Sequence, residues 1–344
     1  MKFIEIDGKM INRKSLPYTI AEAGINHNGN IELAYEMVAI AKNAGADAIK
    51  FQTFKADEFC NKESELYETF KKCEFSEDQW KGIKQLCDLL KITFLSTPQN
   101  YSDLELLLKL GIQAIKIGSD DLTNIPLIKR YALTKLPIIL SCGMAYESEI
   151  EAAINTIRDI DKMYPVIVMH CTSLYPTLPR QVNIRKLGSL NNKYPRILSG
   201  YSDHTVGYVA AVMAVAYGAK VLETHFTLDN SLEGPDHKFS KNPNDLKAWI
   251  TAIHQAYQML GESSLNPTDK EFQMRNIARR SLTAIKNIAI NEVFTTDNIG
   301  MMRPGDGLKP LFLGTFLGQI ASRNIQAGEQ LQREDIYYAQ NNNG

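Results

Sequence analysis

The apolar residues of the chain follow two alternating spacings. Short apolar runs of strand length recur from Tyr18 onward, and longer stretches with helical spacing separate them, for example 31–44, 78–91, 147–160 and 206–217. The eight runs cover 18–21, 48–52, 93–95, 114–116, 137–140, 166–169, 197–202 and 221–226. Strand-length runs alternating with helices are typical of a parallel barrel in the α/β class. We therefore predict a (β/α)₈ TIM barrel over residues 18–260.

Three further segments flank this barrel. Residues 1–17 are predicted to form a β-hairpin lid with Asp7-Gly8 at the turn. The polar stretch 261–280 is predicted to be a linker. Residues 281–344 contain two similar stretches, 287–299 and 324–336, each with an Asn-Ile start and a central Glu. This internal repeat predicts a small β-rich module with pseudo-symmetry. The connection 54–77 is longer and more charged than the others, so we expect it to cover a substrate.

The composition excludes several classes of protein. The 344 residues carry a formal net charge of -1 and no long basic or acidic run, so nothing indicates binding to nucleic acid or to an anionic membrane. The five cysteines form no C-x-x-C pair, which argues against a disulfide framework or a zinc ribbon. No run approaches the length of a membrane span. We therefore predict a cytoplasmic protein.

Two histidines end consecutive apolar runs, His204 after Ser202-Asp203 and His225 two residues after Glu223. The carboxyl ends of parallel strands meet at one edge of a sheet, so both imidazoles are predicted at one rim. Neutral imidazole is a ligand for transition metals. The sequence therefore predicts a metal site, and local hydrogen bonding at two strand ends is the alternative.

Two lysines lie near the ends of apolar runs, where an unpaired ammonium is costly to bury. Hydroxyl residues follow comparable runs. The set consists of Lys50, Lys116, Thr97, Ser119, Ser141 and Ser202. Ammonium and hydroxyl groups together hold a phosphate or a carboxylate well. We predict a small, multiply anionic ligand next to the metal, and pairing of each lysine with a nearby carboxylate is the alternative.

Three more residues have chemistry suited to a site. Glu22 ends the first run and is a candidate for binding sugar hydroxyls or exchanging protons, with a capping loop as the alternative. Asp236 is a candidate ligand for substrate hydroxyls, and Arg303 lies in a turn-rich loop that would present it. His170 follows an all-apolar run and is left out of the site as a hydrogen-bonded core histidine.

Several motifs together resemble one known family. They are Ala21-Glu22-Ala23-Gly24-Ile25-Asn26-His27-Asn28-Gly29, Lys50-Phe51-Gln52, Phe94-Leu95-Ser96-Thr97-Pro98, Lys116-Ile117-Gly118-Ser119, His170-Cys171-Thr172, Tyr175-Pro176-Thr177, Ser202-Asp203-His204 and Glu223-Thr224-His225-Phe226. In this order they resemble the sialic acid synthase family, which includes legionaminic and pseudaminic acid synthases. Residues 281–344 resemble that family's antifreeze-like SAF domain.

The resemblance implies a transferase of nonulosonic acid biosynthesis that condenses phosphoenolpyruvate with N-acetylmannosamine or a related amino sugar. It implies that phosphoenolpyruvate binds at the lysine and hydroxyl positions already named and at Ser173. It also implies that His204 and His225 hold a divalent ion, which is expected to be manganese, with magnesium or cobalt as alternatives. It further implies that Glu22, Tyr175, Glu223, Asp236 and Arg303 face the sugar, with Glu22, His204 and His225 catalytic. Arg303 would reach into the barrel of a partner chain, which makes the working unit a domain-swapped homodimer.

The chain departs from the family pattern at positions that bear on substrate choice. Ser119-Asp120-Asp121 replaces the usual Ser-Gly-Glu, so Asp121 is expected to inherit that carboxylate, and Ser173 stands where an Asn is common. Cys142 occupies a common Thr position. A 6-deoxy diacetamido sugar leading to legionaminic or pseudaminic acid is therefore an alternative acceptor. The sequence is also compatible with a metal-dependent hydrolase, with a synthase of seven- or eight-carbon keto acids, and with a carbohydrate- or ice-binding protein built on the SAF-like module without turnover.

Overall fold

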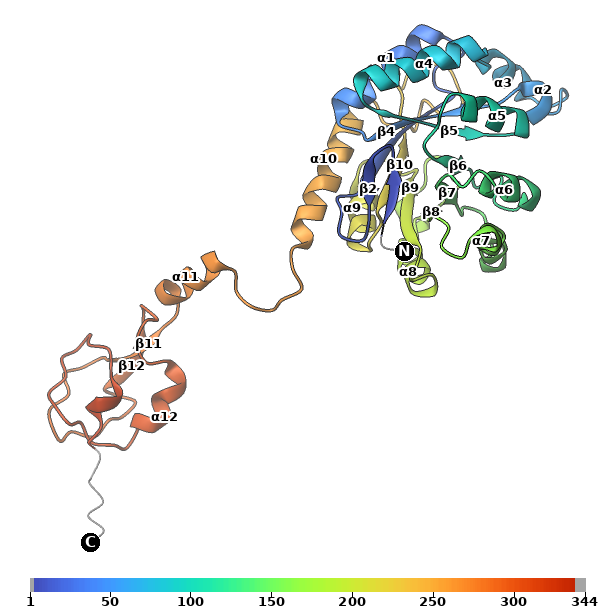
Figure 1. Ribbon diagram of the computed structural model, residues 1–344. Helices are drawn as coiled ribbons and strands as arrows, with labels where there is room; N and C mark the ends of the chain where they lie inside the picture. Colours follow the sequence, from blue (N-terminus) through green and yellow to red (C-terminus); the bar gives the residue numbers. More distant parts are fainter. Residues whose placement is uncertain (1–2, 338–344) are drawn as a thin grey trace. The chain divides into compact units, whose positions relative to one another are not determined.

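The computed structural model describes residues 3–337, which divide between Gly261 and Glu262 into two compact units, unit 1 (3–261) and unit 2 (262–337). Unit 1 is built on an eight-stranded parallel sheet in the order β5-β4-β3-β10-β9-β8-β7-β6. Its strands are β3 (Tyr18–Gly24), β4 (Ala48–Thr53), β5 (Thr93–Pro98), β6 (Ile115–Ile117), β7 (Ile138–Ser141), β8 (Val166–Cys171), β9 (Leu198–Asp203) and β10 (Val221–His225). Because β5 and β6 lie side by side, the sheet curls into a nearly closed barrel (Figure 1). The predicted TIM barrel is confirmed.

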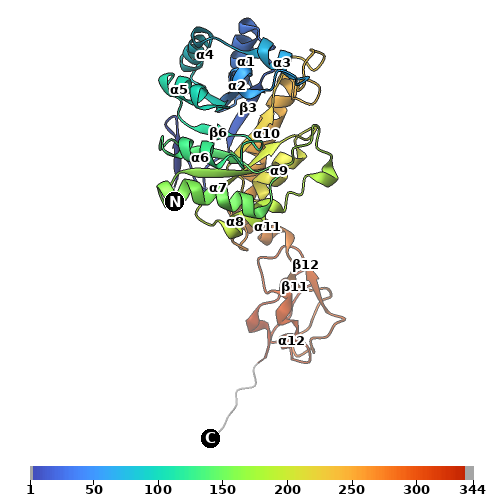
Figure 2. The same ribbon diagram turned by 90° about the vertical axis from the view of Figure 1, so that its right-hand side faces the viewer.

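Helices surround the strands, as Figures 1 and 2 show. They are α1 (Ile31–Ala44), α4 (Glu77–Leu90), α5 (Tyr101–Lys109), α6 (Ile125–Ala132), α7 (Glu147–Ile160), α8 (Lys186–Lys193), α9 (Val209–Ala216) and α10 (Pro243–Leu260), with a short 3₁₀ turn at Pro179–Gln181. Local signals begin and end them: Asn30 caps α1, and Gly45 at φ 93° ends it. Ser76 and Gln79 form a capping box on α4. Because these helices return the chain to the start of the next parallel strand, all strand carboxyl ends lie on the same rim.

The barrel has two apolar layers. One lies between the strands and the helices and contains Trp80, Trp249 and Tyr131. The other fills the amino-terminal end of the barrel, where the hairpin β1 (Ile4–Ile6) and β2 (Lys9–Ile11) adds Ile4, Ile6 and Ile11 to a cluster of strand residues. The hairpin turns at Asp7 and Gly8, both at positive φ, as the sequence predicts. It therefore closes the end of the barrel opposite the strand carboxyl ends, and is not a lid over a substrate.

The connection between β4 and α4 forms two short helices, α2 (Ala56–Phe59) and α3 (Tyr67–Cys73). A separate apolar cluster of Ile25, Phe54 and Cys73, with Phe59 and Phe70 packed against it, holds this segment on the rim. The segment is therefore ordered by its own small core.

Unit 2 contains β11 (Ser281–Ala284) paired with β12 (Ile299–Met302), the helices α11 (Asp269–Ala278) and α12 (Leu313–Phe316), and 3₁₀ turns at Pro310–Phe312 and Arg333–Asp335. Helix α11 lies in the stretch expected to be a linker, where Thr268 and Glu271 form a capping box that starts it.

The internal repeat in unit 2 is visible as reciprocal contacts. Ile288 and Ile325 exchange backbone hydrogen bonds. The Asn287 side chain accepts from the Ala327 amide, and the equivalent Asn324 accepts from the Ile290 amide, both at 2.8 Å. Matching asparagines bonded to matching amides show that the two copies are related by pseudo-symmetry.

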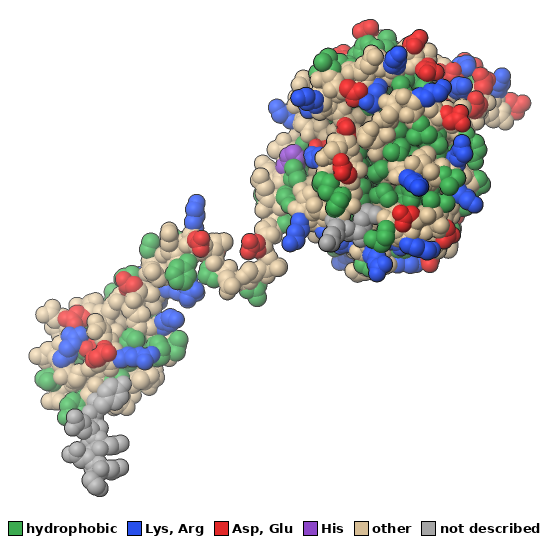
Figure 3. Space-filling model, in the orientation of Figure 1, with side chains coloured by type: hydrophobic (Ala, Val, Ile, Leu, Met, Phe, Trp, Pro, Cys, Tyr) green, Lys and Arg blue, Asp and Glu red, His purple; other side chains and the backbone are tan. Residues whose placement is uncertain are grey.

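Charged side chains of both signs are interspersed over the visible surface of unit 1 (Figure 3). This distribution agrees with the formal net charge of -1. Within residues 3–337, no helix combines the length and the apolar character needed to cross a membrane.

Candidate active site

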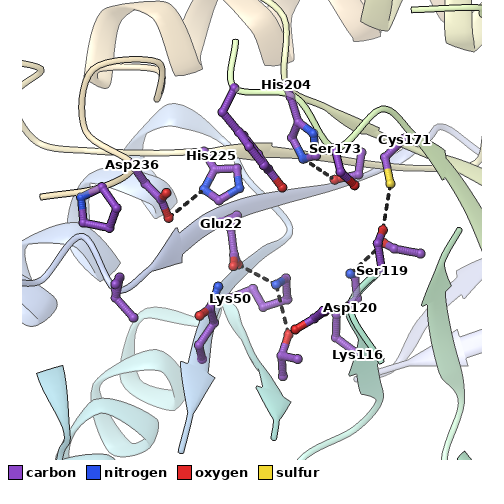
Figure 4. A pocket seen from close by; sticks show the side chains of 18 of the residues that line it. Glu22, Lys50, Lys116, Ser119, Asp120, Cys171, Ser173, His204, His225 and Asp236 are labelled. Carbon is purple, nitrogen blue, oxygen red and sulfur yellow. Dashed lines mark hydrogen bonds and ion pairs between the residues drawn. The ribbon is translucent and has the colours of Figure 1, made fainter. Parts of the chain in front are cut away.

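The strand carboxyl ends surround a cavity of about 420 Å³, a size typical of small-molecule sites. All the predicted site residues of unit 1 line it: Glu22, Lys50, Thr97, Lys116, Ser119, Ser141, Ser173, Tyr175, Ser202, His204, Glu223, His225 and Asp236. Figure 4 shows a part of this lining. The parallel strands bring the residues together because alternate side chains near each strand end point into the barrel.

Two ammonium groups lie on the floor of the cavity. Lys50 Nζ is 2.7 Å from Glu22 Oε2 and 3.7 Å from Glu223 Oε2, and Lys116 Nζ is 3.6 Å from Glu223 Oε1. All four side chains are almost fully buried. Glu223 therefore bridges two lysines that come from different strands. Each lysine thus pairs with a carboxylate, as the alternative interpretation predicts, and also lines the cavity. The binding of an anion by the two lysines stays a prediction.

Burial and charge act in opposite directions in this network. Burial acts to lower the pKa of the Lys50 ammonium, but Glu22 and Glu223 outweigh it and the pKa is raised. Burial acts to raise the pKa of the Glu223 carboxyl, and the attraction of Lys116 and Lys50 brings it down to about 2. Lys50 can therefore meet an anion in the charged form.

Hydroxyl groups surround the ammonium groups. Lys50 donates to Thr97 Oγ1 at 3.2 Å, and Lys116 donates to Ser141 Oγ at 2.8 Å. Ser202 donates to Glu223 Oε1 at 3.0 Å. These contacts fix the ammonium groups at the cavity wall, and the hydroxyls keep lone pairs or protons free for a ligand.

Ser119 and Ser173 come close together around Gly143. A Cβ at Gly143 would lie 2.3 Å from Ser173 Oγ and 2.8 Å from Ser119 Oγ, so glycine is needed for this approach. The Gly143 amide donates to Ser119 Oγ at 3.0 Å, and the Cys171 thiol lies 3.1 Å from the same oxygen. The result is a second polar cluster beside Lys116 in Figure 4.

The two predicted metal ligands lie side by side, with ring centroids of His204 and His225 5.5 Å apart. His204 Nδ1 donates to the Thr172 carbonyl at 2.7 Å, which leaves the lone pair on Nε2, 3.3 Å from Ser202 Oγ. Burial, followed by the neighbouring His225, lowers the pKa of His204 to about 3, so this ring stays neutral. Tyr175 packs 4.4 Å from the His204 ring.

These residues fit a divalent ion. His225 Nδ1 is buried without a hydrogen-bond partner and lies 3.7 Å from Asp236 Oδ2. The cavity lining also carries four carboxylates, those of Glu22, Asp120, Glu223 and Asp236, against two ammonium groups. No group of three or more His, Cys, Asp and Glu side chains placed to hold a metal occurs within residues 3–337. The protein would thus supply a pair of nitrogens to a divalent ion, whose other ligands would come from water or substrate.

Two carboxylates near the motifs, those of Asp203 and Asp121, do not line the cavity. Asp203 faces away from the cavity and accepts from Trp249 Nε1 at 2.9 Å and from the Thr205 amide at 2.9 Å, so it holds the β9 turn against α10. Asp120, and not Asp121, lines the cavity. Asp121 accepts from Asn124 at the start of α6, and the expectation that it supplies the family's carboxylate is wrong.

The remaining outcomes concern single residues. His170 is buried with Nε2 2.7 Å from the Val182 carbonyl, which confirms it as a core histidine. Cys142 is buried behind the site and donates to the Met169 carbonyl at 3.2 Å. Arg303 is exposed in unit 2, directly after β12.

The cavity is also lined by residues that were not among the predicted site residues. They are Ile25, Gln52, Phe59, Leu66, Thr69, Phe70, Gln99, Gly118, Asp120, Met144, Cys171 and Pro235. For Gln52 a signal was present, because it follows Lys50 by two positions in the same strand and therefore faces inward. The length and charge of the connection 54–77 predicted that it covers a substrate, but not which of its side chains face the cavity, because that depends on how the segment packs.

A barrel whose rim combines buried lysines, hydroxyls and a histidine pair defines an enzyme of the TIM-barrel class. The NeuB family model matches residues 37–264, and the SAF domain model matches residues 279–336. The chain belongs to the NeuB family and carries a SAF domain.

Known proteins are similar over nearly the whole chain. An N,N'-diacetyllegionaminic acid synthase of Legionella pneumophila is 37% identical over 93% of this chain and 94% of that protein. A pseudaminic acid synthase of Campylobacter jejuni is 35% identical over 93% and 96%. The crystal structure of an N-acetylneuraminic acid synthetase from Leptospira borgpetersenii superposes with a TM-score of 0.75 at 33% identity, covering 80% of this chain and 96% of that one.

Proposed function

We propose that this enzyme condenses phosphoenolpyruvate with an N-acetylated amino sugar to give a nine-carbon 2-keto acid and phosphate. The acceptor is N-acetylmannosamine or a related sugar, including the 6-deoxy diacetamido sugars that lead to legionaminic or pseudaminic acid. The observation that carries the proposal is the single cavity in which two buried ammonium groups adjoin a pair of imidazoles. The relatives named as synthases of such acids support the same reaction.

The chain's own groups have distinct tasks in this reaction. Lys50, Lys116 and the nearby hydroxyls, Ser173 among them, hold the carboxylate and phosphate of phosphoenolpyruvate by charge-assisted hydrogen bonds. Tyr175, Glu223 and Asp236 contact the sugar and orient its aldehyde toward C3 of the bound phosphoenolpyruvate. C3 then bonds to the aldehyde carbon, water adds at C2, and cleavage of the C–O bond releases phosphate.

Two groups complete the site. A divalent ion at His204 and His225, manganese in the first instance, supplies Lewis-acid polarisation when bound. Glu22 is assigned to proton exchange, because it lies in the cavity with Oε2 bonded to no hydrogen-bond donor other than its ion-pair partner Lys50. The proposal also includes a domain-swapped homodimer in which Arg303 enters the partner's barrel; its exposed position after β12 supports this.

The test is phosphate release from phosphoenolpyruvate in the presence of manganese and a panel of acceptor sugars. We expect release with N-acetylated amino sugars and none with arabinose 5-phosphate. Lys116→Met is expected to abolish release, because the variant lacks one of the two ammonium groups, while Lys193→Met on the surface is the matched control. Release with arabinose 5-phosphate alone would instead favour a synthase of eight-carbon keto acids. Sugar binding without any release would favour a carbohydrate-binding protein.

A further inference from the structure

One carboxylate of the cavity, that of Asp120, has no partner of its own. Asp120 lines the cavity, and among residues 3–337 its side chain forms no hydrogen bond and no ion pair. Gly118 lies two positions after Lys116, so a side chain at this position would face the cavity as Lys116 does. The space that a Cβ at Gly118 would need is occupied by Asp120 Oδ1. The Asp120 carboxylate is therefore folded back toward the cavity.

Asp120 lies at the same end of the cavity as the two lysines. Figure 4 shows its side chain beside those of Lys50 and Lys116. Burial acts to lower the pKa of Lys50, and nearby carboxylates raise it, Asp120 among them. Asp120 is therefore close enough to interact with the Lys50 ammonium.

The two imidazoles lie across the barrel from this end. Strands β5 and β6 are neighbours, and β9 and β10 stand opposite them, half-way round the barrel. Asp120 follows β6, whereas His204 follows β9 and His225 ends β10. The acceptor sugar of the proposed reaction, held at the imidazoles, therefore approaches phosphoenolpyruvate from the side opposite to Asp120.

Phosphoenolpyruvate cannot satisfy the Asp120 carboxylate. In its fully ionised form this substrate has carboxylate and phosphate oxygens, which accept hydrogen bonds, and no donor. A group with protons must therefore lie between the substrate and Asp120, and water is such a group. Gln99, in the turn after β5, is a second open acceptor: it lines the cavity, is 7% exposed, and its Oε1 has no hydrogen-bond partner among the described residues. Two open acceptors at this end favour a bound water.

The other three carboxylates of the cavity are engaged elsewhere. Burial acts to raise the pKa of Glu223, but its two lysine partners bring it down to about 2, so Glu223 is a weak base. Glu22 is paired with Lys50 at 2.7 Å. Asp236 lies 3.7 Å from His225, on the side of the sugar. Asp120 is therefore the cavity carboxylate best placed to take up a proton at the lysine end.

We infer that Asp120 is the general base for the water that adds at C2 of phosphoenolpyruvate; the inference rests on the proposed function. C2 carries both the carboxylate and the phosphate oxygen, so it lies beside the ammonium groups that hold them. Because the sugar covers the opposite side, the water reaches C2 from the side of Asp120.

Asp120 handles one proton in this step. The water oxygen forms its bond to C2, which carries positive charge after C3 has bonded to the aldehyde carbon, and one water proton passes to Asp120. The C–O bond to phosphate then breaks with its electron pair on the phosphate oxygen, and Asp120 returns the proton to that oxygen. The second water proton leaves as the C2 carbonyl forms, and it balances the proton taken up by the aldehyde oxygen. Asp120 ends the cycle ionised, as it began.

The test compares Asp120→Asn with Asp121→Asn. The first variant keeps the shape of the side chain but cannot take up a proton, and the second is the matched control because Asp121 does not line the cavity. Phosphate release with manganese and an accepted sugar gives kcat and KM. Loss of a general base lowers a rate by roughly 100- to 10,000-fold. We expect such a fall in kcat for Asp120→Asn, with a KM for phosphoenolpyruvate that is unchanged or lower, because a negative charge near the anion has been removed.

Thermal unfolding with and without phosphoenolpyruvate checks that the variant is folded and binds its substrate. A ligand that binds the folded state raises Tm, so phosphoenolpyruvate should raise the Tm of Asp120→Asn at least as much as that of the wild type. Asp120→Gly removes the side chain completely and is the second variant. It should show the same loss of kcat.

Three results would overturn the inference while the wild type still releases phosphate and the proposed function stands. The first is a kcat of Asp120→Asn within tenfold of the wild type. The second is a loss confined to a higher KM for phosphoenolpyruvate or for manganese, since Asp120 would then only bind a ligand. The third is an equal loss in Asp121→Asn, which would assign the effect to the turn. No release by the wild type with any acceptor would instead overturn the proposed function, and the inference with it.

Discussion

Glu223 is the residue whose replacement should most clearly reveal the charge network of the cavity. Glu223→Gln keeps the shape of the side chain and the hydrogen bond with Ser202, but removes the charge between the two lysines. Lys50 keeps Glu22 at 2.7 Å. Among the described residues, Lys116 keeps no carboxylate within ion-pair distance.

The size of the effect follows from burial. Glu223 is 4% exposed and Lys116 is 3% exposed. Removing one partner of a buried pair costs roughly 3–5 kcal/mol, and the low end, about 3 kcal/mol, applies because the pair faces an open cavity. For a unit of this size, 1 kcal/mol corresponds to a change in Tm of about 2–4 °C, so Tm should fall by about 6–12 °C.

The assay is thermal unfolding of the full chain with and without phosphate. Phosphate should raise the Tm of Glu223→Gln more than that of the wild type, because an unpaired ammonium binds the anion more tightly and binding stabilises the folded state. Glu151→Gln is the matched control, since its carboxylate pairs with Lys193 at 3.1 Å on the surface and is worth about 0–1 kcal/mol. If both variants unfold at the same temperature, the charge of Glu223 does not stabilise the two buried lysines as described above.

Two further predictions concern histidines. His225→Ala should lose both manganese binding, measured by calorimetric titration, and phosphate release, while its circular dichroism spectrum stays that of the folded protein. The control His254→Ala, on α10, should keep manganese binding, phosphate release and the spectrum. An active His225→Ala would refute the metal assignment. Burial lowers the pKa of His27 from 6.5 to about 3, so the unfolded chain takes up a proton below about pH 6.5 that the folded chain refuses. Stability from this group is present above pH 6.5 and is lost as the pH falls toward 3, at up to about 1.4 kcal/mol per pH unit. Between pH 7 and pH 5, urea unfolding of His27→Asn should therefore lose less stability than the wild type, by up to about 2 kcal/mol, and identical slopes would contradict this.

The sequence by itself determined the architecture of unit 1. Strand-length runs alternating with capped helices are local patterns, and the handedness of β-α-β connections leaves few ways to assemble them. It also determined which residues reach the rim, because alternate positions near a strand end point the same way. His204 and His225 could be placed together for this reason, as could Lys50 and Lys116.

Only the tertiary structure decided how those residues pair and what surrounds them. The bridge from Lys50 through Glu223 to Lys116 joins strands β4, β10 and β6, and its distances depend on the curvature of the barrel. The turn after β6 brings Asp120 rather than Asp121 into the cavity. The position of α2 and α3 depends on packing against the loop at Gly29, which no local pattern encodes.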